Sequence, residues 1–84
     1  MSRFWPDGVP ITVACNDLAT PVAFKWEGNE HVVIQIIDRW RVDEGWWRRR
    51  IWREYFQLVT RSGLLVLIYH DIRAAEWSLQ RLYD

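Results

Sequence analysis

The chain has 84 residues and a formal net charge of zero, because 11 basic residues balance 11 acidic ones. Nucleic-acid-binding domains are usually basic, so this balance argues against binding through the overall field of the molecule. A hydrophobic fraction of 50% argues against a disordered tail. A chain of this length supports one modest core and one domain.

The cysteine content and the apolar segments indicate the compartment. The single cysteine, Cys15, excludes a disulfide framework within the chain. The first residues are too polar for a secretory signal, and no uncharged run is longer than that of residues 62–70, which is too short to span a bilayer. We therefore expect a reduced, cytoplasmic domain with no membrane segment.

The first half of the chain shows the alternating pattern of half-buried strands. Residues 1–8 contain Pro6 and Gly8 and are predicted to form an N-terminal arm ahead of a domain at 9–84. Alternation predicts strands over 9–14, 22–27 and 32–42. In the third strand one face is apolar and the other mixed, which predicts a curled sheet. The members of the apolar face are Val32, Ile34, Ile36, Trp40 and Val42.

The second half predicts further strands and one ambiguous segment. Residues 43–45 are expected to end the third strand, and a link rich in Trp and Arg leads to a hairpin of 55–59 and 64–69. The second of these strands is apolar on both faces and is predicted to be central. Residues 74–83 fit helical spacing slightly better than alternation. The pattern as a whole predicts an all-β fold, either a small, strongly curled antiparallel sheet or an SH3-like barrel of five to six strands.

The residues that carry chemistry do not form a catalytic or metal-binding pattern. Cys15 has only His31 and His70 as imidazole partners, and nothing near it supplies the electropositive setting that a thiolate needs. Asp43 and Glu44 are neighbours at a turn, which is not the arrangement of an acid–base pair. The spacings typical of metal ligands and of phosphate-binding loops are absent. The sequence therefore predicts a protein that is not an enzyme and has no cofactor and no metal.

The densest feature is the strip of residues 39–53, which holds six of the 11 basic residues and four of the seven Trp. Arginine and indole groups could bind single-stranded nucleic acid through phosphates and bases. The same residue types are enriched at the centre of protein interfaces. Net neutrality favours a protein partner, with nucleic acid as the alternative and self-association through an edge strand as a third. The predicted contact residues are Arg41, Trp46, Trp47, Arg48, Arg49, Arg50, Trp52 and Arg53.

The order of short motifs over residues 40–84 resembles a known arrangement. Gly45-Trp46-Trp47 is followed by Arg53-Glu54-Tyr55-Phe56, a hairpin and Trp77-x-Leu79. This order is similar to a small bacterial domain family and to the C-terminal tail of ImuB, a catalytically inactive relative of Y-family DNA polymerases. The resemblance implies that the last segment is a strand whose Trp77 and Leu79 face the core. It also implies a non-enzymatic accessory in DNA damage tolerance or translesion synthesis, with repair or polymerase-associated proteins as partners.

Overall fold

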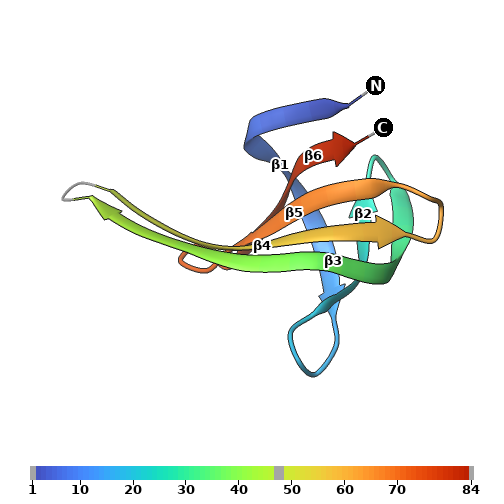
Figure 1. Ribbon diagram of the computed structural model, residues 1–84, viewed down its shortest axis with the longest axis horizontal. Helices are drawn as coiled ribbons and strands as arrows, with labels where there is room; N and C mark the ends of the chain where they lie inside the picture. The colour runs from blue at the N-terminus through green and yellow to red at the C-terminus, as the bar shows by residue number, and fades with distance from the viewer. Residues whose placement is uncertain (1, 47–48, 84) are drawn as a thin grey trace.

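A computed structural model describes residues 2–46 and 49–83, in which six antiparallel strands form one closed sheet (Figure 1). Each strand pairs with the next along the chain, and the last pairs with the first. The predicted all-β class is confirmed. The strands are β1 (Arg3–Cys15), β2 (Pro21–Trp26), β3 (Asn29–Trp46), β4 (Arg49–Thr60), β5 (Leu65–Asp71) and β6 (Glu76–Tyr83).

The core lies inside the closed sheet and is built by the short strands together with the second half of β4. Apolar side chains of β4, β5 and β6 pack there against Phe24 of β2. β5 is buried on both faces over residues 66–69, as its apolar run predicts. The side chains that are fully buried in this core are Phe24, Phe56, Leu58, Val66, Ile68 and Leu79.

The sheet closes because two long strands change partners along their length. β1 pairs with β6 up to Ile11 and with β2 from Thr12 onward. β3 pairs with β2 up to Val32 and with β4 from Val33 onward. Each of these strands therefore joins the two halves of the sheet, so that six strands can enclose a core.

The expected N-terminal arm over residues 1–8 is wrong from Arg3 onward, because these residues belong to β1. Arg3 pairs with Leu82 of β6, and the two ends of the described chain lie side by side (Figure 1). The register is irregular between Phe4 and Val9, and Gly8 adopts a positive φ of 76° within this bulge. The bulge removes the alternation by which a strand is recognised in a sequence.

Two bulges also change the predicted faces of β3. The register with β4 shifts between Val33 and Gln35 and again between Ile36 and Asp38. The extra residues, Ile34 and Ile37, are exposed, whereas Val33 and Ile36 pack against the core. The expectation that Ile34 and Ile36 share one apolar face is therefore wrong, because each bulge reverses the alternation that follows it.

The helical pattern at the end of the chain has a similar origin. Residues 76–83 form β6, as the resemblance implies, and the helix is wrong. The register with β5 shifts at Gln80, so Leu79 and Leu82 both reach the core although they are three positions apart. A spacing of three imitates one face of a helix, so a bulged strand and a helix give the same local pattern.

β3 and β4 extend beyond the closed sheet as a hairpin arm, defined here as residues 40–46 and 49–55 (Figure 1). Trp46 and residues 49–54, expected to belong to a link, therefore lie in strands, whereas Trp47 and Arg48 lie outside the described residues. Gly45, expected to end the third strand, pairs with Arg50 inside the arm. β5 accompanies β4 only as far as Arg53, so the outer part of the arm is two-stranded. Within residues 2–46 and 49–83 there is no helix that could cross a membrane.

Replacement of Gly8 by alanine should destabilise the fold through both strain and overlap. An alanine Cβ would lie 2.6 Å from Tyr69 Oη and 2.8 Å from Ser78 Cβ, at a φ of 76°. We expect Gly8→Ala to lower the free energy of unfolding by about 2–5 kcal/mol in urea titrations. Gly28→Ala is the matched control, because its φ of 77° is the same but nothing lies within 4 Å of the new Cβ. The control should lose about 1–2 kcal/mol; equal losses in the two variants would show that the overlap has no effect.

Candidate interaction surface

The hairpin arm has two different faces, because residues directly opposite each other in an antiparallel pair point to the same side. On one face of the arm the side chains point to the same side of the sheet as the core residue Phe56 of β4, and we call it the core-side face. We call the opposite face the outer face. The core-side face is formed by the pairs Arg41–Glu54, Asp43–Trp52 and Gly45–Arg50, and the outer face by Trp40–Tyr55, Val42–Arg53 and Glu44–Ile51.

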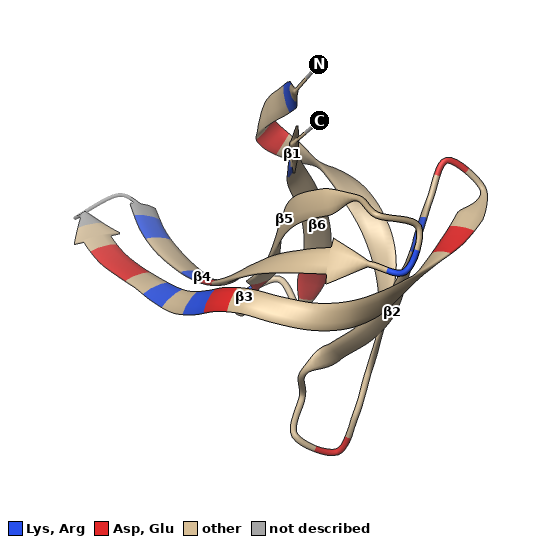
Figure 2. Cartoon of the chain, turned by 45° about the vertical axis from the view of Figure 1, so that its right-hand side comes forward, with Lys and Arg blue, Asp and Glu red and all other residues tan. Residues whose placement is uncertain are grey.

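Ion pairs occupy the core-side face. Arg39 Nε donates to Glu54 Oε2 at 3.0 Å, and Arg41 Nη2 lies 3.7 Å from the same oxygen. Arg50 holds both oxygens of Asp43 in a forked pair of 3.2 and 3.1 Å. Figure 2 shows the resulting alternation of basic and acidic bands along the arm. The predicted basic strip is therefore largely neutralised where its side chains are described.

The outer face carries a row of aromatic rings that crosses three strands. Tyr69 of β5 is opposite Tyr55 of β4, which is opposite Trp40 of β3. The Trp40 and Tyr55 rings are nearly parallel, with centroids 5.4 Å apart and an interplanar angle of 7°. The Tyr55 and Tyr69 centroids are also 5.4 Å apart. Tyr69 is buried and its Oη donates to the Asp7 carbonyl at 3.2 Å, so the row is anchored at its inner end.

Arg53 covers the inner part of this aromatic row. Its guanidinium carbon lies 4.4 Å from the Tyr69 ring centroid, and its Nη1 donates to Tyr55 Oη at 3.3 Å. Partial burial acts to lower the pKa of Arg53, but the hydrogen bond to Tyr55 and electrostatic interactions with Tyr69, Tyr55 and Asp71 outweigh it, so this pKa is raised above its ordinary value. The Arg53 guanidinium, which contacts both tyrosine side chains, holds the two rings in position.

The predicted contact residues are divided by this geometry. Arg53 lies on the outer face, and the backbones of Trp46 and Arg49 pair at the far end of the arm. Trp47 and Arg48 lie outside the described residues. Three others, Arg41, Arg50 and Trp52, lie on the core-side face. Sequence analysis missed the aromatic row, because the Trp40–Tyr55–Tyr69 alignment depends on pairing between strands that are distant in the chain.

One edge of β3 is unpaired beside the arm. Within the described part of the chain, β2 pairs with β3 only as far as Val32, and no other strand contacts the edge of β3 opposite β4 beyond that residue. Three large apolar side chains of this segment are exposed, Ile34 by 59%, Ile37 by 49% and Trp40 by 39%. An exposed edge with apolar side chains is a typical site for pairing with another chain.

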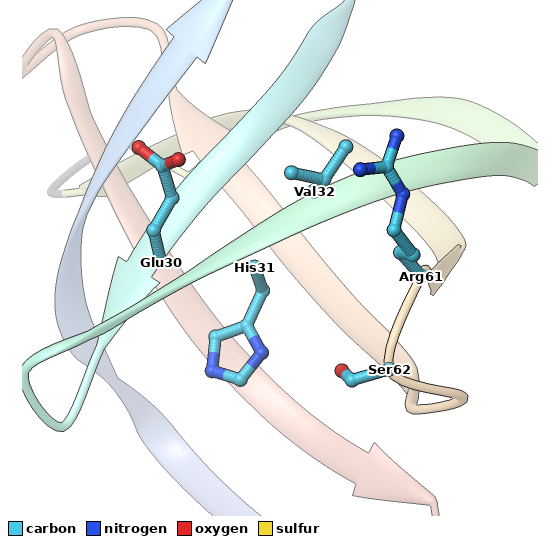
Figure 3. A pocket seen from close by; sticks show the side chains of 5 residues that line it. All are labelled: Glu30, His31, Val32, Arg61 and Ser62. Carbon is cyan, nitrogen blue, oxygen red and sulfur yellow. The ribbon is translucent and has the colours of Figure 1, made fainter.

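The hollow at the start of β3 does not assemble a catalytic group. A hollow of about 240 Å³ is lined by Glu30, His31, Val32, Arg61 and Ser62. Figure 3 shows His31 on the opposite side of the β3 ribbon from Glu30 and Val32, so the carboxylate and the imidazole do not converge. The Ser62 hydroxyl shares a hydrogen bond of 2.8 Å with the hydroxyl of Thr60.

Both histidines are stacked on aromatic side chains. His31 lies 5.2 Å from the Phe24 centroid, and His70 lies 4.6 Å from that of Trp77. Among residues 2–46 and 49–83 there is no group of three or more His, Cys, Asp and Glu side chains that could hold a metal ion. The arm and the free edge of β3 are therefore taken as the candidate interaction surface.

No protein-family model, curated protein or solved structure matches this chain.

The ion pairs of the core-side face should differ in their effect on stability. The Glu54 side chain is 14% exposed and serves two arginines, whereas the Asp43–Arg50 pair is half exposed on both sides. We expect Glu54→Gln to lower the free energy of unfolding by about 1–2 kcal/mol. The control, Asp43→Asn, should change it by less than about 1 kcal/mol. Urea titrations measure both, and a larger effect of Asp43→Asn would contradict this assignment.

Cys15 should react slowly with alkylating agents at neutral pH. Partial burial raises the pKa of its thiol above the ordinary value. The thiolate is the reactive species, so a raised pKa lowers its population at neutral pH. The rate of iodoacetamide alkylation should therefore reach half its plateau at a higher pH in the folded protein than in the same protein in 8 M urea. If the pH of half-maximal alkylation were lower in the folded protein than in urea, the thiol would be activated, which would contradict this prediction and favour a catalytic role for Cys15.

Proposed function

We propose that the protein is a non-enzymatic protein-interaction module that binds its partner through the hairpin arm. The observation that carries the proposal is the position of Trp40, which ends the anchored aromatic row and is exposed beside the free edge of β3. Tryptophan, tyrosine and arginine are the residue types that contribute most to protein interfaces.

The aromatic row is suited to binding because it is held in place before a partner arrives. Tyr69 is fixed by its hydrogen bond to the Asp7 carbonyl, and Arg53 joins Tyr55 to Tyr69. Stacking on Tyr55 restricts the Trp40 ring. A side chain that is already ordered loses little conformational entropy on binding, so more of its contact energy contributes to affinity.

Binding of single-stranded nucleic acid through residues 39–53 is supported less well. Such binding requires cations that are free to contact phosphates. Arg39 and Arg41 contact Glu54, and Arg50 forms a forked pair with Asp43. Phosphate groups would have to compete with these carboxylates, and the one positive charge left over, where Arg39 and Arg41 share Glu54, is too little for a phosphate backbone.

The cellular setting that we propose is cytoplasmic DNA damage tolerance. This part of the proposal is supported by the resemblance of residues 40–84 to the C-terminal tail of ImuB. That tail assembles proteins around an error-prone polymerase, so a repair or polymerase-associated protein is the proposed partner. The segment of resemblance includes the whole hairpin arm.

Photo-crosslinking in cells tests whether the arm contacts a protein. A benzoylphenylalanine placed at Val42, on the outer face, should give discrete protein adducts. The same group at Leu18, an exposed residue in the loop between β1 and β2, is the matched control and should not give these adducts. Equal adducts at the two positions, or none at Val42, would contradict the proposal.

The alternative is tested with the purified protein and a single-stranded oligonucleotide. We expect no saturable quenching of tryptophan fluorescence at low salt. Quenching that weakens steeply with added salt and is lost in Arg41→Gln would favour nucleic-acid binding instead.

A further inference from the structure

The free edge of β3 indicates how the partner binds. We propose that the partner adds an extended strand to this edge, with an aromatic side chain beside Trp40 and an adjacent acidic side chain beside Arg41. This inference rests on the proposed function, because it concerns the partner of the same arm. It identifies the partner segment by its chemistry, as a strand in which an acidic and an aromatic residue are neighbours.

The free edge of β3 is uninterrupted by bulges only along the hairpin arm and the two residues before it. Bulges at Ile34 and Ile37 interrupt the earlier part of β3, and bulged strands pair poorly with a new neighbour. From Asp38 to Trp46 the register with β4 is continuous. This stretch of nine residues without a bulge is long enough for a peptide to pair through its backbone.

The aromatic row specifies one side chain of the added strand. The row crosses β5, β4 and β3 and ends at Trp40, the last strand before the free edge. Neighbouring strands in a sheet are about 4.8 Å apart, close to the spacing of the rings already in the row. A residue of the added strand opposite Trp40 would therefore continue the stack, and an aromatic residue would gain most from that position.

The charges of the core-side face indicate which residue should follow or precede the aromatic residue in the added strand. Arg39 and Arg41 share the single carboxylate of Glu54, which leaves one positive charge uncompensated within this group. The Arg41 side chain is 57% exposed. Trp40 and Arg41 are consecutive and point to opposite faces, and the same alternation holds in the added strand. An acidic residue directly next to the aromatic one would therefore lie beside Arg41.

A second copy of this chain fits the edge less well. Antiparallel pairing of two β3 edges centred on Arg41 would place the two Arg41 side chains opposite each other. Centring on Val42 would place Arg41 opposite Asp43, but Arg50 already holds both oxygens of that carboxylate. An acidic residue from another protein meets neither difficulty.

The inference is tested with labelled peptides of about eight residues that alternate Thr and Val. The test peptide carries Glu-Tyr at its centre. The first control has the same composition with one Thr between Glu and Tyr, so that both side chains lie on one face. The second control keeps the sequence but carries N-methyl groups on the alternate backbone amides that face β3 when Tyr lies opposite Trp40, which prevents strand pairing in that register. Fluorescence anisotropy with the full chain should show binding of the test peptide and at least about tenfold weaker binding of both controls.

Protein variants test the two named contacts. Arg41→Glu should weaken binding of the Glu-Tyr peptide about tenfold and should bind a Lys-Tyr peptide more tightly than the original protein does. Trp40→Thr should weaken binding of the Glu-Tyr peptide by a similar factor while it preserves strand propensity. Arg73→Glu makes the same charge change at an exposed residue in the turn between β5 and β6, and should leave binding unchanged.

The outcomes separate this inference from the proposed function. Equal binding of the N-methylated peptide, or an equal effect of Arg73→Glu and Arg41→Glu, would overturn strand addition. If adducts at Val42 were still found in cells, the arm would remain an interaction surface with a different binding mode. A concentration-dependent dimer in sedimentation that the Glu-Tyr peptide does not dissociate would assign the edge to a second copy and would also overturn the inference.

Discussion

The difference in strand length is the constraint on which the rest of the structure depends. β2 and β5 have 6 and 7 residues, whereas β3 and β4 have 18 and 12. Apolar side chains can be buried only where the sheet closes on itself, and the short strands limit that region. The excess length of β3 and β4 leaves the closed sheet as a two-stranded arm. The free edge and the exposed end of the aromatic row follow from this mismatch.

Strand pairing also decides what the charges of the arm do. The net charge of zero is the sum of two unlike parts of the chain. Residues 39–53 hold six basic residues and are net basic, and the rest of the chain is net acidic. Pairing places Glu54 between Arg39 and Arg41 and places Asp43 beside Arg50. Arg39, Arg41 and Arg50 are therefore held against carboxylates on one face of the arm, which lowers the positive field that a phosphate backbone would meet there.

The sequence predicts the strands well where the period of two is unbroken. Residues 22–27 and 64–69 correspond closely to β2 and β5, and the apolar run of β5 is buried on both faces as expected. The errors fall where a bulge or a long hairpin intervenes. Gly8, Ile34, Ile37 and Gln80 each lie at a register shift, and each shift breaks the alternation on which the prediction relies.

The sequence by itself determined the all-β class, the burial of β5 and the concentration of Trp and Arg between residues 39 and 53, because these depend on local alternation and composition. Only the tertiary structure decided that this strip has two faces, that Arg39, Arg41 and Arg50 contact carboxylates, and that Trp40 continues a row begun by Tyr69. Those features depend on register between strands far apart in the chain. Register is set by closure of the whole sheet around one core, and no local pattern contains it.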